Sequence, residues 1–181
     1  MDGHTCHEHP QSHRGERVLQ QLRIAVGSDK AGRDHATALT DDLRASSLVS
    51  SIIDISALDG QGRAAYPEIA FAAAQLVADG RADRALLVCH TGLGMAIAAN
   101  KIPGIRAVTA HDSWSVRCAV LSNNAQVLTL GQGIVGLGLA RRLVEEWLTY
   151  RFDDTCSAAA KIETISAFED RWQGRSAADA H

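Results

Sequence analysis

Residues 85–94 read A-L-L-V-C-H-T-G-L-G, an apolar run that ends in a cysteine and is followed by a polar pair and two glycines. A short apolar run of this kind is typical of a buried strand. The glycines allow the backbone to turn sharply, and a helical pattern continues through Asn100. The segment therefore predicts a strand, a tight turn and a helix.

The same alternation recurs on both sides of this segment. Upstream, R-I-A-V-G-S-D precedes a helical stretch at 33–46, and V-S-S-I-I-D-I-S precedes a Gly-rich loop and a helical stretch at 67–78. Downstream, I-R-A-V-T-A precedes 113–121, and A-Q-V-L-T-L-G precedes 136–150. These β-α units predict an α/β fold with a five-stranded parallel sheet and helices on both faces, a three-layer α/β/α sandwich.

The tails differ from this pattern. A chain of 181 residues suits one domain, which we place at 22–172. Residues 1–21 show no sustained apolar period and hold four histidines beside Cys6, so we expect a flexible tail, with metal binding as the alternative. A frayed C-terminus is expected at 173–181.

A last helix is predicted at 157–172. Its apolar residues Ile162, Ile165 and Phe168 have a spacing suited to packing on the domain or on a partner.

Composition excludes several classes of protein. The formal net charge is −3, apolar residues make up 46% and aromatic residues 4%, which fits neither a disordered chain nor a nucleic-acid binder. The longest purely apolar run, residues 69–74, is far shorter than the roughly 18 to 20 residues that span a bilayer. The N-terminus lacks the pattern of a secretory signal, so a cytoplasmic protein with reduced thiols is expected. Four irregularly spaced cysteines indicate neither a disulfide framework nor a zinc knuckle.

Ligands of open parallel sheets bind outside the carboxyl ends of the strands. The residues expected at those ends are 27–30, 89–92, 111–113 and 131–133.

The densest signal is V-C-H-T-G-L-G-M, at 88–95. Its glycines can point successive N–H groups at an oxyanion, and the start of a helix adds positive potential. The same field stabilises a thiolate, so Cys89 is a candidate nucleophile or base. A buried, inert cysteine is the alternative. The glycines do not complete a dinucleotide-binding fingerprint, and there is no Walker loop.

Other polar residues at these ends have two interpretations each. Asp29 is either a carboxylate that faces the crevice or a helix N-cap. Lys30 is either a phosphate ligand or a solvated side chain. His111 and Asp112 are either a base with its orienting carboxylate or, for Asp112, a cap of the following helix. His35, inside a helix, is expected at the surface.

Four motifs in this order resemble the ribose/galactose isomerase family, which comprises type B ribose-5-phosphate isomerases and galactose-6-phosphate isomerase subunits. They are G-S-D-x-A-G at 27–32, Y-P at 66–67, C-x-T-G-x-G-M-x-I-A-A-N-K-x-P-G-I-R-A at 89–107 and S-N-N-A-Q-V-L at 122–128. The resemblance extends over 23–169. It implies a Rossmann-like domain that works as a homodimer or tetramer with active sites at the subunit interface, without metal or organic cofactor. The implied reaction interconverts an aldose and a ketose phosphate through a cis-enediolate.

The resemblance also implies roles for individual residues. Cys89 would move the proton between C1 and C2, since one branch of the family uses a glutamate where this chain has Met95. Backbone N–H groups of 92–95 and the Thr91 hydroxyl would bind the enediolate oxygen. The residues expected to form the site are Asp29, Cys89 and Thr91 as catalytic groups, with Lys30, Tyr66, His90, Gly92, Gly94, Met95, His111, Asn123 and Lys161 as substrate ligands.

Departures from the family pattern bear on the substrate. Lys30 replaces a histidine, and Ala65 replaces an aspartate that is available for proton transfer between the two substrate oxygens. Ser122 replaces the histidine credited with opening the furanose ring. Positions of phosphate-binding arginines hold Gly133 and, less surely aligned, Ser157 and Lys161.

A tetrose 4-phosphate cannot close a furanose ring, because its O4 is esterified. We therefore predict a linear substrate, D-erythrulose 4-phosphate, interconverted with D-erythrose 4-phosphate. Lys30 and Lys161 would then act as phosphate ligands. The alternatives are ribulose 5-phosphate, with His90 or His111 opening the ring, and a sugar-phosphate-binding module without catalysis.

Overall fold

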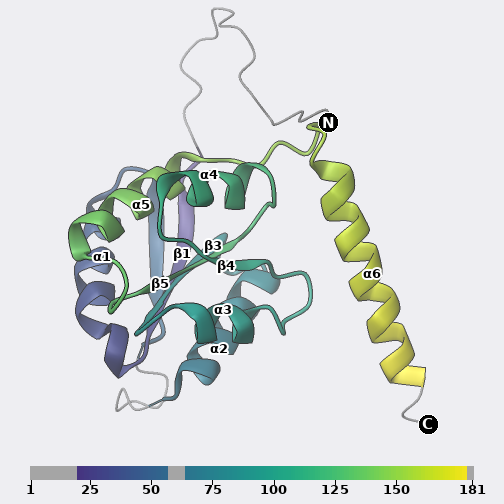
Figure 1. Cartoon of the computed structure of the whole chain (residues 1–181), viewed down its shortest axis with the longest axis horizontal. Helices are drawn as coiled ribbons and strands as arrows, with labels where there is room; N and C mark the ends of the chain where they lie inside the picture. Colours follow the sequence, from purple (N-terminus) through teal and green to yellow (C-terminus); the bar gives the residue numbers. More distant parts are fainter. Residues whose placement is uncertain (1–19, 57–63, 179–181) are drawn as a thin grey trace, which may run out of the picture.

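Five strands form one parallel sheet in the order β2-β1-β3-β5-β4. They are Leu22–Ser28 (β1), Val49–Asp54 (β2), Arg84–Cys89 (β3), Ala107–Thr109 (β4) and Val127–Gly131 (β5). The structure, a computed structural model, describes residues 20–56 and 64–178. Every residue of β3 and β5 is buried, as expected of central strands covered on both faces. The predicted three-layer α/β/α sandwich is confirmed (Figure 1).

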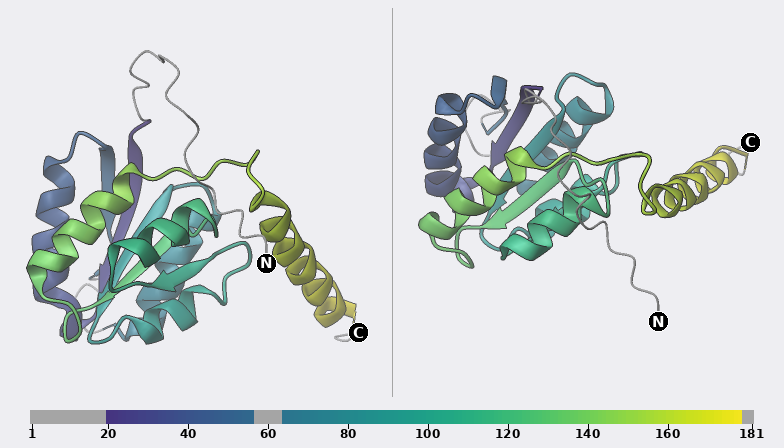
Figure 2. Two further views of the ribbon diagram at one scale, coloured as in Figure 1. Left: turned by 45° about the horizontal axis from the view of Figure 1, so that its top comes forward. Right: turned by 90° about the horizontal axis from the view of Figure 1, so that it is seen from above.

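Helices cover both faces of the sheet (Figures 1 and 2). They are Arg33–Ala45 (α1), Tyr66–Ala78 (α2), Leu93–Ala99 (α3), Ser113–Leu121 (α4) and Leu137–Thr149 (α5). A sixth helix, Ala159–Ala178 (α6), does not cover the sheet (Figure 1). One buried cluster joins α1, α4 and α5 to the sheet, and a second joins α2 and α3 to the opposite face. Apolar residues at alternate positions of β1, β3 and β5 belong to one cluster or the other, because successive side chains of a strand point to opposite faces of the sheet.

The strand order reverses at β1. β2 pairs with one side of β1 and β3 with the other, all in parallel register. A position where the strand order reverses is the place at which open α/β sheets bind ligands, in the crevice outside the carboxyl ends of the two strands. Here it brings the segment that follows Ser28 beside the segment that follows Cys89.

The C-terminal helix α6 extends away from the sheet (Figures 1 and 2). The Gly104 N–H donates to the Glu169 carboxylate at 2.7 Å, which links α6 to the loop after α3. The helix continues beyond the predicted end at Trp172 to Ala178, within the segment for which fraying is predicted. Its last turn ends in two alanines, which are strong helix formers.

Several predicted segments lie outside the described residues. They are 1–19 of the predicted tail, the Gly-containing loop at 57–63 and the last residues, 179–181. In the described part of the chain, no helix is both long and apolar enough to cross a bilayer.

Candidate functional site

Cys89 is the last residue of β3 and lies at the carboxyl edge of the sheet. Its exposed fraction is 6%, and it packs in the cluster beneath α2 and α3. The sulfur is nevertheless not a purely apolar contact, because the Gly92 N–H donates to Sγ at 3.1 Å. Gly92 has φ +82°, a conformation that L side chains rarely adopt. The left-handed turn at Gly92 thus points an N–H group at the thiol.

The loop after β5 packs closely against this turn through two glycines. A Cβ placed on Gly131 would lie 2.7 Å from the Thr91 Cα, so only glycine fits there without a shift. The ring of His90 lies over Gly133, where an added Cβ would come within 2.8 Å of Nδ1 and Nε2. Thr91 and His90 therefore pack directly against the loop after β5, and the His90 side chain is exposed.

The segment after β1 closes the other side of the crevice. Lys30–Gly32 forms a 3-10 turn (η1), and a Cβ on Gly32 would lie 2.7 Å from the Cys89 backbone N. The Asp29 Oδ1 accepts N–H bonds from Ala31 at 2.9 Å and from Gly32 at 3.1 Å. The N-cap interpretation of Asp29 is confirmed, and the exposed Lys30 follows it at the same edge.

Tyr66 and the first turn of α3 also meet. A Cβ on Gly94 would lie 2.7 Å from the Tyr66 ring, so the aromatic ring rests on the glycine. Met95 is fully buried, and only its backbone N–H can serve a ligand. α3 has seven residues, so stabilisation of an anion here depends on individual N–H groups more than on the dipole of a long helix.

His111 and Asp112 follow β4, at the edge of the sheet. Asp112 caps α4, since its carboxylate accepts the Ser115 N–H at 2.8 Å and the Ser115 hydroxyl at 2.7 Å. These bonds hold the pKa of Asp112 below its usual value. The capping interpretation of Asp112 is confirmed, and His111 is exposed.

Two predicted ligands do not reach this edge in the same chain. Asn123 follows the C-terminus of α4 and precedes β5, which places it at the amino edge of the sheet, opposite Cys89. Lys161 lies on α6, which extends away from the sheet (Figure 1). Both side chains are exposed. A site that uses them must therefore take them from a second copy of the chain.

Sequence reasoning missed two polar contacts that support the site. Thr109 and Thr129 lie side by side on β4 and β5, with their hydroxyl oxygens 2.7 Å apart. The Thr129 hydroxyl donates to the Gly92 carbonyl at 2.9 Å. The repeated pattern A-V-T and V-L-T, with threonine as the third residue of both strands, is a signal that could have revealed this pair.

The second missed contact concerns His35, which was expected at the surface and is half-buried instead. The ring Nε2 of His35 lies 3.0 Å from the Val135 carbonyl oxygen. The backbone N–H of His35 donates to the side-chain oxygen of Gln132 at 3.0 Å. The reason is that α1 starts beside the loop after β5, so its first turn packs on that loop.

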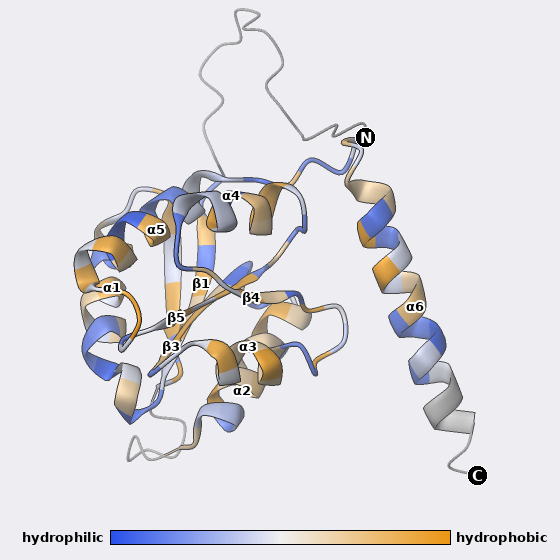
Figure 3. Ribbon diagram, in the orientation of Figure 1, coloured by the Kyte–Doolittle hydropathy of each residue, from blue (hydrophilic) through white to orange (hydrophobic). Residues whose placement is uncertain are grey.

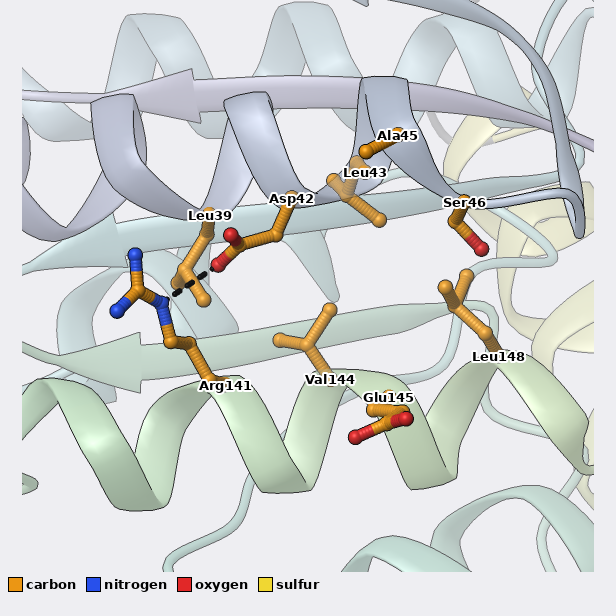
Figure 4. Close-up of a pocket in the computed structure, with 9 residues that line it drawn as sticks. All are labelled: Leu39, Asp42, Leu43, Ala45, Ser46, Arg141, Val144, Glu145 and Leu148. Carbon is orange, nitrogen blue, oxygen red and sulfur yellow. Dashed lines mark hydrogen bonds and ion pairs between the residues drawn. The ribbon is translucent and has the colours of Figure 1, made fainter.

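A separate cavity of about 390 Å³ lies between α1 and α5 (Figure 4). Leu43, Val144 and Leu148 form apolar walls, and Arg141 forms an ion pair with Asp42 at 2.8 Å across the opening. None of the predicted site residues lines this cavity.

Within the described residues, no cluster of three or more His, Cys, Asp or Glu side chains could hold a metal ion.

The chemistry available at the carboxyl edge is proton transfer. A thiolate beside convergent N–H donors can remove a proton from a carbon next to a carbonyl group, while the donors stabilise the oxyanion that forms. Asp29, Lys30, Tyr66, Cys89, His90 and Thr91 belong to the segments that meet there.

Comparison with known proteins gives a consistent result. Residues 24–165 match the Ribose/Galactose Isomerase family. The chain is 54% identical to D-erythrulose-4-phosphate isomerase 2 of Mycolicibacterium smegmatis over 148 residues, covering 82% of this chain and 97% of the relative. It is 39% identical to D-erythrulose-4-phosphate isomerase of Pectobacterium atrosepticum, over 82% of this chain and 95% of that protein.

A solved structure shares the fold. Ribose-5-phosphate isomerase B of Clostridium thermocellum superimposes with a TM-score of 0.76 at 33% identity, over 83% of this chain and 99% of the other. Since the family match extends over most of the chain and includes the cysteine turn, the chain belongs to the ribose/galactose isomerase family.

Proposed function

We propose that this isomerase interconverts D-erythrulose 4-phosphate and D-erythrose 4-phosphate, with the Cys89 thiolate as the base and a cis-enediolate as the intermediate. The observation that carries the proposal is the Gly92 N–H bond to Cys89 Sγ at the carboxyl end of β3. It gives the thiol a polar partner that a purely structural cysteine does not need. The names of the two relatives above support the four-carbon substrate.

The reaction moves protons within one substrate molecule and requires no oxidant or reductant. The thiolate removes the proton from C1 of the ketose, the electron pair of the broken C–H bond forms the C1–C2 double bond, and the carbonyl oxygen at C2 becomes the enediolate oxygen. The hydroxyl proton on O1 moves to O2, and the thiol returns its proton to C2 while O1 becomes the aldehyde oxygen. Backbone N–H groups of 92–95 and the Thr91 hydroxyl support the negative charge as it develops.

A linear substrate agrees with the residue at position 122. Ser122, which precedes Asn123 at the end of α4, carries no imidazole to open a furanose ring, and a four-carbon 4-phosphate needs none. Lys30, at the crevice in the same chain, supplies a cation for the phosphate. A reduced thiol at position 89 suits the reducing conditions of the cytoplasm, where we place the reaction.

The first experiment compares kcat/KM for D-erythrulose 4-phosphate and D-ribulose 5-phosphate in the wild-type protein, His90→Ala and His111→Ala. We expect a preference for the tetrulose of at least about tenfold, the effect of about one good polar contact, that persists in both variants. Ribulose turnover that collapses in one histidine variant would support the pentose alternative instead. Absence of turnover of both substrates, together with no exchange of substrate hydrogen for solvent deuterium, would indicate a binding module.

We further propose a homodimer in which one chain supplies Cys89 and its partner supplies Asn123 and Lys161. The positions of these two residues away from Cys89 in one chain support it. So do the exposed apolar side chains of α6, Ile165, Phe168 and Trp172, with exposed fractions of 55%, 61% and 62%. Figure 3 shows hydrophobic segments both on α6 and on α3.

The dimer is tested by mixing two impaired variants, Cys89→Ala and Lys161→Ala. If the site is shared, each mixed dimer contains one intact site and one site that lacks both groups. With random exchange of subunits between two-fold dimers, about a quarter of the wild-type activity should return. A mixture that stays at the mean of the two variants would contradict a shared site.

A further inference from the structure

The cysteine turn is held through its Gly92 carbonyl by a pair of hydroxyl groups, one buried and one half-buried. Thr129 is fully buried, and its hydroxyl donates to the Gly92 carbonyl at 2.9 Å. The Thr109 hydroxyl oxygen lies 2.7 Å from that of Thr129. Because each hydroxyl carries a single hydrogen, and that of Thr129 is committed to Gly92, Thr109 is the donor of the bond between them.

Gly92 is thus fixed at both of its backbone groups. Its N–H donates to Cys89 Sγ at 3.1 Å, while its carbonyl accepts from Thr129 and from the Ala96 N–H at 3.1 Å. A glycine at φ +82° has no side chain that restricts its rotation. The orientation of its two peptide groups therefore depends on these outside contacts.

The hydroxyl at position 129 is not needed to complete the sheet. Thr129 pairs in register with Leu87 of β3, which is fully buried and apolar. Leu128 and Leu130 on either side are also fully buried. A valine would fill the same volume as Thr129, so its hydroxyl serves the turn more than the packing of the core.

We propose that Thr129, oriented by Thr109, is a positioning residue: by binding the Gly92 carbonyl it keeps the Gly92 N–H directed at the Cys89 sulfur and the next peptide aligned for the substrate oxyanion. This role rests on the proposed function, because it acts through Cys89. It adds Thr109 of β4 and Thr129 of β5, which act through Gly92, to the groups that determine the rate.

The test compares Thr129→Val, which keeps the shape and removes the hydroxyl, with Thr129→Ser, which keeps the hydroxyl. We expect Thr129→Val to lower kcat at least about tenfold, because small misplacement of reacting groups is costly, with KM changed less than about twofold. Thr129→Ser should retain kcat within about twofold. Thr109→Val leaves the Thr129 donor in place and should have an intermediate effect.

Alkylation of Cys89 by iodoacetamide at pH 7, followed on the Cys89 peptide by mass spectrometry, provides a readout independent of turnover. A hydrogen bond from an N–H donor favours the thiolate, which is the form that reacts. We therefore expect the alkylation rate to fall about threefold in Thr129→Val.

Thr40→Val is the matched control. Thr40 is also buried, and its hydroxyl donates to the Ala36 carbonyl at 2.7 Å within α1, on the opposite face of the sheet. It should lose comparable stability without changing kcat or alkylation. Wild-type kcat and alkylation in Thr129→Val, or the same changes in Thr40→Val, would overturn the positioning role. An alkylation difference in a protein that isomerises no sugar phosphate would support that role and contradict the proposed function.

Discussion

Replacing Cys89 with alanine should lower kcat by at least about a thousandfold, within the range by which a positioned base accelerates proton transfer. Its sulfur receives the Gly92 N–H at 3.1 Å and no other thiol lies in the segments that meet at the crevice. KM should change little, since the phosphate and hydroxyl ligands remain. The measurement is turnover of D-erythrulose 4-phosphate together with uptake of solvent deuterium at the reacting carbon, followed by NMR.

Cys118→Ala is the control for this variant. Cys118 lies in α4 and is a free, half-buried cysteine, so its loss tests for a general effect of removing a thiol. It should leave both turnover and deuterium uptake unchanged. If Cys89→Ala exchanged deuterium at the wild-type rate, the base would have to be another group, and the thiol would be a packing residue.

Replacing Gly32 with alanine should destabilise the fold by about 3 kcal/mol, the upper part of the range for overpacking. The added Cβ would clash with the Val88 carbonyl group and lie 2.7 Å from the Cys89 backbone N. All these atoms belong to the backbone of a central strand, which cannot move aside as a side chain would. For a domain of this size the loss corresponds to a Tm lower by about 10 °C, measured by calorimetry.

Gly138→Ala is the matched control for Gly32→Ala. Gly138 lies in α5 with nothing within 4 Å of an added Cβ, and alanine is the better helix former, by about 0.5 to 1 kcal/mol. Its Tm should therefore stay the same or rise. A Gly32→Ala protein with wild-type Tm would mean that η1 can move away from β3 without cost. A Gly32→Ala protein that stays folded should still lose activity, because Asp29 and Lys30 would be displaced from Cys89.

Much of the fold could be predicted because the apolar patterns that define it are local. Each strand is a short apolar run and each helix has its own periodicity, so the five β-α units are recognisable in the sequence. The end of α6 was placed too early, since helix propensity alone does not tell where a helix ends. Thr109 and Thr129 were missed because the A-V-T and V-L-T patterns show threonine at the same position of two strands, but not the pairing and register that bring the two hydroxyl groups together.

The candidate site shows a different limit. The motif around Cys89 predicted a strand end and a glycine turn, and the structure has both, with the Gly92 N–H directed at the thiol, because glycine spacing and a strand end are local features. The motif around Asn123 predicts a substrate ligand, yet it does not show where the residue lies relative to Cys89. That information depends on the path of α4, which carries the chain back to the amino edge of the sheet.

The stacking of His90 on Gly133 has a consequence for evolution. A side chain at position 133 would meet the tip of an exposed, rotatable imidazole rather than a rigid backbone. Mutations there would turn His90 toward a new direction with little loss of stability. Selection could therefore alter the polar lining of the crevice by single substitutions at position 133. The glycines at 32 and 131 lie against backbone atoms, so substitutions there would destabilise the fold.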